Sequence, residues 1–470
     1  RATETARQRV QDALDARRPL GTRCVVNWAR YKTVQIKANI VVRREQDQTA
    51  IRQRVLDRLH RAINPLPTAE HDGSPFGQAL RASHVYDIAL SEPGVLWVDP
   101  PQMIVQEVPD RGVASIVADP VQPHTWYAGS ESTLYRSLDD GEGWEPIGRF
   151  SETRIQAVCT HPDRAGLLAV AAHLPDGAGS RVHISRDLGE SWLPDVQTVS
   201  FEIEDLAWVS RGSDAVLLMA TDVGLYELAQ RPGSTPVQVL VDPRDQDLGF
   251  YAVAASRDVR GQVSVAVAAR GTGGIYLSSE GGRRESFRQI GLKGRDVRVL
   301  AVQYDGPRSF LWAGVAAAGG DEGEGTFRWE LRGAEDPPEG WVAFSAGWQG
   351  GSCRDLAFLG GQVVAATHRA GVLRLPAGRS DAEWQAPGVR CGLPLRDPGR
   401  FHPVDTVATD PGGGVVLAGG LEGVHRSTDG AESYQDVSRQ EFSDKVTLPP
   451  TWLFCSGEHE VTVVSQDEAS

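Results

Sequence analysis

One eight-residue pattern, S-x-D-x-G-x-x-W, constrains the fold of this 470-residue chain more than any other feature. It is complete at residues 137–144 and 185–192, and looser copies stand at 278–287 and 427–434. Ser and Asp side chains can accept hydrogen bonds from backbone N–H groups two residues on, and Gly adopts the positive φ that other residues resist. The aromatic residue then begins the next strand and packs beneath the turn. The pattern predicts recurring hairpin turns with these structural residues: Ser137, Asp139, Gly141, Trp144, Ser185, Asp187, Gly189, Trp192, Ser427, Asp429 and Tyr434.

From residue 113 the chain repeats in seven units that begin 42 to 56 residues apart. The first strand of each unit ends in small residues, which suit strands crowded around a central axis. Each second strand is small and apolar as well, and most fourth strands open on an aromatic residue. Four strands in each of seven units predict a seven-bladed β-propeller over residues 109–445.

The turn pattern resembles the Asp-box repeat of sialidase-like and sortilin-like β-propellers. This resemblance implies the fold more than an activity, because the Asp-box usually lies away from the central channel of such propellers. The box is weak or missing in the third, fifth and sixth units. Closure of the ring does not require it in every blade.

Residues 1–108 carry different periodicities, which predict a small α+β domain. The fold class is therefore mainly β, a seven-bladed β-propeller preceded by a small α+β domain. We expect three helices in the first domain, over 3–17, from a cap at Asp47 or Thr49 to 63, and over 78–90. We expect strands over 24–28 and 33–42 and a strand region over 94–108.

Residues 446–470 fall outside the seven units. Apolar and polar residues alternate over 446–448 and 461–464, which is typical of strands. We expect this tail to form a hairpin against a blade edge.

Several stretches of the first domain, taken in order, resemble the C-terminal domain of baseplate J-like proteins. These are D-A-R-R-P-L-G-T-R at 15–23, Tyr31 before the long strand, I-N-P-L at 63–66, G-S-P-F-G at 73–77, S-H-V-Y at 83–86 and P-G-V at 93–95. Baseplate J-like proteins build the baseplate wedges of contractile tails, in phages, R-type bacteriocins and phage-tail-like contractile injection systems. The larger N-terminal wedge core expected of that family is absent from this sequence.

The resemblance implies a structural baseplate component. Its first domain would dock into the baseplate, and its propeller would be a peripheral module that binds a protein or another ligand. The partners would be other wedge, spike or sheath-proximal subunits. The location would be the cytoplasm of the producing cell, within an assembled particle.

Charge is divided unevenly along the chain, whose net charge is −14. Residues 1–61 hold 15 Lys/Arg against 6 Asp/Glu, or +9, and the remaining residues hold 33 against 56, or −23. This basic start favours a docking surface for acidic protein neighbours over nucleic acid, because the basic residues fall on helix and strand patterns and form no tail. The arginines that we expect on this assembly surface are Arg17, Arg18, Arg43 and Arg44.

The sequence offers little chemistry. The five cysteines are scattered, which favours buried thiols in a reducing compartment, and no His/Cys cluster has metal-ligand spacing. No arginine triad or carboxylate pair can be placed, so we expect no catalytic residues, no cofactor, no membrane insertion and no enzyme activity. The rival interpretation is a sialidase-like or lectin-like propeller that binds or cleaves glycans. A channel-facing cluster of arginines and carboxylates would favour the rival.

Overall fold

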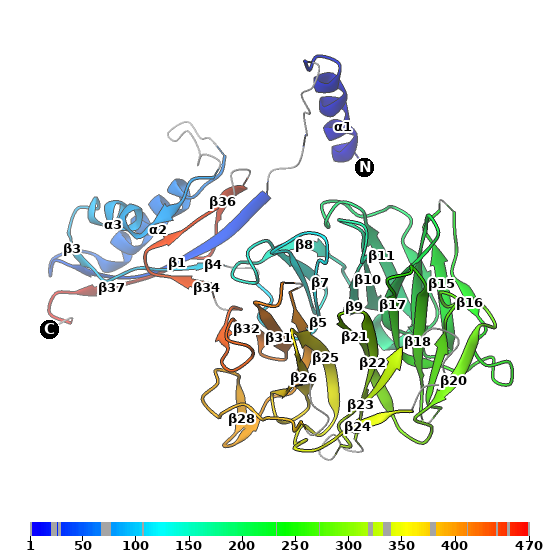
Figure 1. Cartoon of the computed structure of the whole chain (residues 1–470). Helices are drawn as coiled ribbons and strands as arrows, with labels where there is room; N and C mark the ends of the chain where they lie inside the picture. The colour runs from blue at the N-terminus through cyan, green and yellow to red at the C-terminus, as the bar shows by residue number, and fades with distance from the viewer. Residues whose placement is uncertain are drawn as a thin grey trace. The chain divides into compact units, whose positions relative to one another are not determined.

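The computed structural model describes residues 2–19, 26, 30–66, 77–105, 108–231, 233–271, 273–317, 323–331, 340–376, 382–410, 412–438, 440–448 and 452–468. The chain forms two compact units. One is an α+β unit made of Arg1–Glu107 together with Arg439–Ser470, and the other is a propeller made of Val108–Ser438 (Figure 1).

The α+β unit is built from both ends of the chain. The N-terminal part contains α1 (Ala2–Asp15), β1 (Arg30–Val42), α2 (Gln48–Ala62), β2 (Leu80–Arg81), α3 (Ala82–Leu90), β3 (Val95–Val98) and β4 (Gln102–Val105). The C-terminal part adds β34 (Gln440–Phe442), β35 (Lys445–Val446), β36 (Trp452–Ser456) and β37 (Glu460–Ser465). The strand expected over 24–28 lies outside the described residues except for Val26.

Strand β1 is the centre of this unit's main sheet. It pairs antiparallel with β3 and β4, and parallel with β36 and β37. Ile40 pairs with both Val98 of β3 and Val463 of β37, so these two strands flank β1 on opposite sides. The C-terminal strands thus complete the sheet that the N-terminal residues begin.

The expectation that the tail packs as a hairpin against a blade is wrong. Strands β36 and β37 lie side by side with β1, while β35 pairs with β2. The physical reason is that Val446, Phe454 and Val461 are buried in the core of the α+β unit. An alternating pattern indicates a strand, but it does not identify the partner of that strand.

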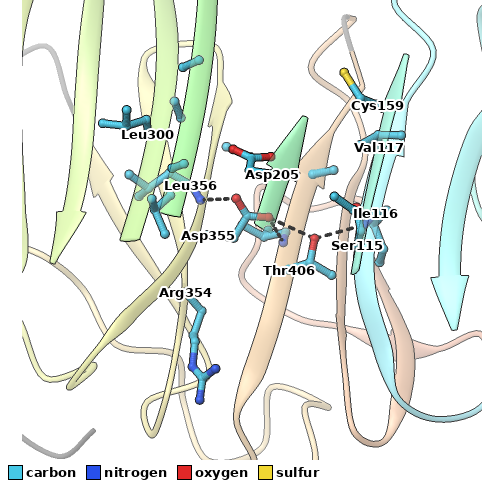
Figure 2. A pocket seen from close by; sticks show the side chains of 18 of the residues that line it. Ser115, Ile116, Val117, Cys159, Asp205, Leu300, Arg354, Asp355, Leu356 and Thr406 are labelled. Carbon is cyan, nitrogen blue, oxygen red and sulfur yellow. Dashed lines mark hydrogen bonds between the residues drawn. The ribbon is translucent and has the colours of Figure 1, made fainter. Parts of the chain in front are cut away.

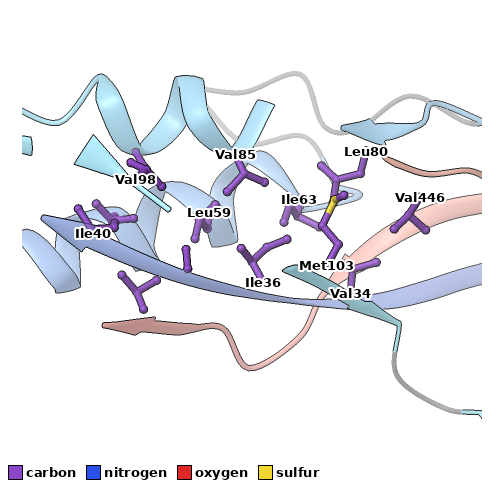
Figure 3. Close-up of a cluster of buried hydrophobic side chains, with 14 of the residues drawn as sticks. Val34, Ile36, Ile40, Leu59, Ile63, Leu80, Val85, Val98, Met103 and Val446 are labelled. Atoms are coloured by element: carbon purple, nitrogen blue, oxygen red, sulfur yellow. The ribbon is translucent and has the colours of Figure 1, made fainter. Parts of the chain in front are cut away.

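The core of the α+β unit lies between the sheet and its helices (Figure 3). Every second residue of β1 from Val34 to Val42 is buried, as the alternation predicts. Helix α2 packs Ile51, Val55 and Leu59 against this face. Asp47 is the N-cap residue of α2, and its Oδ1 accepts hydrogen bonds from the backbone N–H groups of the second and third residues after it, at 2.9 and 3.1 Å.

The propeller is inserted between two neighbouring strands of the α+β unit. Val105, the last residue of β4, pairs with Gln440, the first residue of β34. The chain therefore leaves the sheet at one residue and returns directly opposite to it, after the whole propeller. The connection of an antiparallel hairpin has been replaced by a domain.

Within its described residues the propeller contains seven blade sheets of three or four strands and one two-stranded sheet, which confirms the predicted fold class. Blades one to three consist of β5 (Val113–Ala118), β6 (Trp126–Ser130), β7 (Thr133–Ser137) and β8 (Glu145–Arg149); β9 (Arg154–Thr160), β10 (Leu168–His173), β11 (Ser180–Ser185) and β12 (Gln197–Val199); and β13 (Ile203–Arg211), β14 (Asp214–Thr221), β15 (Gly224–Ala229) and β16 (Val237–Val239). A short 3-10 helix, η1 (Pro175–Gly177), lies between β10 and β11.

Blades four to seven consist of β17 (Phe250–Arg257), β18 (Val263–Ala269), β19 (Ile275–Ser278) and β20 (Phe287–Gly291); β21 (Val297–Asp305), β22 (Arg308–Val315), β23 (Thr326–Leu331) and β24 (Val342–Phe344); β25 (Cys353–Leu359), β26 (Gln362–Thr367) and β27 (Val372–Pro376); and β30 (Val404–Thr409), β31 (Val416–Gly420), β32 (Gly423–Ser427) and β33 (Gln435–Asp436). In blade six a single bridge from Arg374 to Gln385 takes the place of the fourth strand. A small hairpin, β28 (Leu395–Asp397) and β29 (Arg400–Phe401), precedes blade seven.

The S-x-D-x-G-x-x-W stretches form the expected turns. In the first of them, Ser137 Oγ accepts the N–H of Gly141 at 2.8 Å, and Asp139 Oδ1 accepts the N–H of Gly143 at 2.7 Å. Both bonds recur at 185–192 and 427–434. At 278–287 the serine bond alone recurs, as Ser278 Oγ accepts the N–H of Gly282 at 3.1 Å. Trp144 is buried, whereas Trp192 is half-buried.

Each of these turns is also bound by an arginine of the preceding blade. Arg136, 3% exposed, pairs with Glu145 of its own blade and donates to Leu188 O at 2.8 Å in the turn of blade two. Arg426 of blade seven donates to Asp140 O in blade one at 2.8 Å. Arg211 and Arg374 make equivalent contacts with the turns of blades four and seven. The turns therefore link neighbouring blades as well as reversing the chain.

Candidate functional site

A cavity of 1460 Å³ runs along the propeller axis, and all seven first strands line it. These strands are β5, β9, β13, β17, β21, β25 and β30. Figure 2 shows side chains from several blades converging on this space. The cavity lies wholly within the propeller.

Every first strand carries a β-bulge at the same place. Pairing with the second strand skips one residue near the strand's start, and a bulge of this kind re-aims the side chain of the unpaired residue. The skipped residues all line the cavity, so they form a ring around one of its ends, here called the channel ring. Its members, in blade order, are Ala114, Gln156, Glu204, Tyr251, Arg298, Arg354 and Asp405.

One side of the channel ring is occupied by closed ion pairs. Glu204 pairs with Arg270 at 2.5 Å, and Arg298 pairs with Asp296 at 3.0 Å. Both guanidinium groups lie over the ring of Tyr251, at 4.9 and 4.5 Å from its centroid. Burial raises the pKa of Glu204, although the Arg270 charge opposes that shift.

The other side of the channel ring is more loosely paired. Arg354 lies 3.5 Å from Asp405, and its guanidinium is 3.1 Å from His368 Nδ1. Burial raises the pKa of Asp405, while the nearby charges of Arg354, Arg154 and His368 act in the opposite direction. Arg154 is the exposed first residue of β9 and also lines the cavity.

A second level lies at the residue that follows each bulge. In four blades this residue is polar and joins its blade to the next one: Ser115, Asp205, Asp355 and Thr406. Asp205 accepts the N–H of Val253 at 2.9 Å, and Asp355 accepts that of Val407 at 3.0 Å. Thr406 Oγ1 accepts the N–H of Ile116 at 3.1 Å, which links blade seven to blade one and closes the ring of blades. Figure 2 shows Arg354 pointing away from the level of Asp205, Asp355 and Thr406.

Burial raises the pKa of both carboxyl groups at this second level. The pKa of Asp205 rises to about 7 and that of Asp355 to about 6. Backbone N–H donors, among them the Val253 and Val407 amides, oppose the shifts by stabilising the charged forms. Asp205 and Asp355 thus connect neighbouring blades, and both also line the cavity.

The residues expected from the sequence lie elsewhere. None of the eleven turn residues lines the cavity. In the α+β unit, Arg17 and Arg18 follow α1, and Arg43 and Arg44 follow β1; all four are exposed. Arg18 pairs with Asp15, and Arg44 pairs with Asp467. No described contact brings the two arginine pairs together.

Sequence reasoning missed the channel ring. The signal was present in the aligned first strands, where the second position varies among Ala, Gln, Glu, Tyr, Arg and Asp between apolar neighbours. Within the described residues, no three His, Cys, Asp or Glu side chains are grouped as a metal site. In that same part of the chain, no helix is long and apolar enough to cross a membrane.

By sequence, no protein family and no curated protein matches this chain. By structure, it is similar to the GH74 enzyme of Niastella koreensis, with a TM-score of 0.54 and 16% identity over 70% of this chain and 54% of that one. It is also similar to the GH74 xyloglucanase of Xanthomonas campestris, with a TM-score of 0.51 and 17% identity over 73% and 56% of the two chains. The chain thus spans little more than half the length of either enzyme, and the likeness shows the propeller fold alone.

This comparison contradicts the expectation that the chain is not an enzyme. Both similar structures are named as glycoside hydrolase family members, one of them a xyloglucanase, so this architecture gives no ground for excluding catalysis. The expectation rested on finding no carboxylate pair in the sequence. Glu204 and Asp405 belong to blades three and seven, and only the closed ring places both at the same end of one cavity.

Proposed function

We propose that this chain is a baseplate component of a phage-tail-like contractile injection particle. The α+β unit would dock into the baseplate, and the propeller would be its peripheral binding module. One observation carries the proposal: the propeller enters and leaves the α+β sheet at the paired residues Val105 and Gln440. A module inserted in this way leaves the surrounding fold intact, which suits a docking domain that carries an accessory.

Surface charge supports the docking role of the α+β unit. Arg43 and Arg44 are exposed at the end of the central strand, within the basic first part of the chain. Residues 1–61 hold a charge balance of +9 against −23 for the remaining residues, so the stretch that contains Arg43 and Arg44 differs in sign from the rest of the chain. The α+β unit as a whole holds 18 Lys/Arg and 18 Asp/Glu, so its basic character is confined to this stretch. Complementary charge guides docking and disfavours incorrect partners.

Particle assembly tests the proposal. Arg17, Arg18, Arg43 and Arg44 are changed together to Glu, and incorporation of the chain into purified particles is measured. We expect incorporation to fall while the melting temperature of the free chain changes little, because exposed substitutions cost little stability. The matched control reverses four exposed arginines of the propeller, Arg231, Arg257, Arg284 and Arg308, and should leave incorporation unchanged. Equal incorporation of both variants would refute the docking role.

A second candidate is a propeller that binds or cleaves glycans. The observation that favours it is the cluster of arginines and carboxylates at one end of the cavity, together with the aromatic face of Tyr251. Incubation of the chain with neutral and acidic oligosaccharides, followed by chromatography of bound and released sugars, tests this candidate. Absence of both binding and cleavage across that panel would eliminate it.

A further inference from the structure

The channel ring has one gap. Ala114 of blade one contributes only a methyl group where the other six blades contribute a longer side chain. Its neighbours around the ring are Gln156 of blade two and Asp405 of blade seven. Gly112 and Val113 also line the cavity here, so small side chains leave space beside the two polar ones.

Two arginine side chains lie around this gap. Arg154 and Arg354 are both close enough to Asp405 to lower its pKa through their charge, and Arg354 donates to His368 Nδ1 at 3.1 Å. The Arg354–Asp405 separation of 3.5 Å is longer than an N–H···O hydrogen bond. The side chain of Arg154 takes part in none of the described hydrogen bonds or ion pairs. Guanidinium donors therefore remain available, in contrast to the closed pair of Arg270 with Glu204 at 2.5 Å on the opposite side.

The geometry points to an oxyanion-binding site at the Ala114 gap, in which Arg154 and Arg354 bind a carboxylate or phosphate group of a small polar ligand. A guanidinium fork matches the paired oxygens of either group. Asp405 would accept a hydrogen bond from a neighbouring hydroxyl of the ligand, which favours an acidic sugar over a bare anion. This inference rests on the propeller's being a ligand-binding module and does not depend on which assembly carries it.

The overall charge of the chain makes this local arrangement informative. With a net charge of −14, the protein repels anions in general. An anion that binds it must therefore find a local excess of positive charge, which a cavity wall of low dielectric strengthens. At the gap, the positive charges of Arg154 and Arg354 lie near the single carboxylate of Asp405.

Calorimetric titration of the full chain tests the site with three probes. D-glucuronate and D-glucose differ only at C6, where glucuronate has a carboxylate and glucose a hydroxymethyl group. We therefore expect glucuronate to bind and glucose to bind at least tenfold more weakly. Inorganic phosphate identifies the source of the oxyanion: tighter binding of phosphate than of glucuronate would support the site and assign it to a phosphorylated ligand. Equal binding of glucose and glucuronate would overturn the inference, as would no binding of either anion.

Variants then locate the binding. R154Q and R354Q should each weaken glucuronate at least tenfold, whereas R231Q, on an exposed arginine elsewhere in the propeller, should not change it. R354K keeps the charge without the planar fork and should lie between wild type and R354Q. A114F should abolish binding by filling the gap, with the melting temperature as the check on folding. Unchanged affinity in the double variant R154Q/R354Q would show that the anion binds elsewhere and would overturn the assignment. Particle assembly plays no part in these measurements, so their failure is separable from failure of the docking role.

Discussion

Replacing residues 106–439 by a two-residue Asn-Gly turn should leave a folded α+β unit. Val105 and Gln440 are directly paired across β4 and β34. A two-residue type I′ turn connects such a pair with the twist that antiparallel strands require. The excision removes the propeller and keeps every strand that pairs with β1.

Truncation after residue 107 removes the propeller too, but it should not give a folded unit. It deletes β36 and β37, which pair with β1 along most of its length, and it deletes the buried side chains of Val446, Phe454 and Val461. Burial of an apolar side chain stabilises by about 1.5–3 kcal/mol, so these three contribute roughly 5–9 kcal/mol. That equals much of the total stability of a small domain, about 5–15 kcal/mol.

Urea unfolding followed by circular dichroism distinguishes the two shortened chains. The turn-closed chain should unfold cooperatively, with an m value of about 1–3 kcal/mol/M. The truncated chain should show no cooperative transition. A truncated chain that unfolds cooperatively, or a turn-closed chain that does not, would refute the assignment of the C-terminal strands to this sheet.

Three further predictions concern the propeller. Trp144→Ala should destabilise by about 3–5 kcal/mol, the cost of emptying a buried aromatic site, and Asp139→Ala by only about 1–2 kcal/mol through lost turn hydrogen bonds; denaturant midpoints check both values. Arg136→Ala should cost about 3–5 kcal/mol in the same assay, because it removes the buried guanidinium that pairs with the Glu145 carboxylate. The folded pKa of Asp205, about 7, exceeds the ordinary value of 3.8. The contribution of this carboxyl group to the unfolding free energy is therefore fully present below pH 4 and is lost as pH rises through 7. Asp205→Asn should show a smaller fall in unfolding free energy between pH 5 and pH 8 than wild type, measured by denaturant unfolding.

The repeat and the turns could be predicted from the sequence because both are local. Ser137, Asp139 and Gly141 lie within five positions of one another, and their hydrogen bonds need no distant partner. The same is true of the apolar stripe of α2 and the alternation in β1. The position of these elements and the number of blades could therefore be predicted from local patterns.

What sequence reasoning missed was contact between distant segments. Phe454 joins a core formed by residues more than 300 positions earlier, and nothing in its own neighbourhood indicates that. Arg154 and Asp405 approach one another only because blade seven meets blade one in a closed ring. The channel ring depends on seven bulges, and the pairing that defines a bulge cannot be read from one strand alone.

Arg354 and Asp355 are consecutive residues of one first strand, and we expect them to have different roles. Arg354 should contribute to ligand binding and Asp355 to the stability of the propeller. Arg354 is the unpaired bulge residue, exposed, with a loose ion pair, so Arg354→Ala should change the unfolding free energy by about 0–1 kcal/mol. Asp355 accepts hydrogen bonds from Thr406 Oγ1 and from the N–H of Val407, each at 3.0 Å, in the next blade. Asp355→Ala leaves these donors without their acceptor, which costs about 1–3 kcal/mol for each donor. Near pH 7 the substitution also removes the cost of burying a charged carboxylate, which raises the pKa of Asp355 to about 6, and this offsets part of the loss. Urea unfolding at pH 7 should therefore place Asp355→Ala well below Arg354→Ala in stability, while ligand titration places them in the reverse order of impairment. If Arg354→Ala proved less stable than Asp355→Ala, the bulge residues would contribute to the packing between blades. Binding and stability would then not be divided between these two positions.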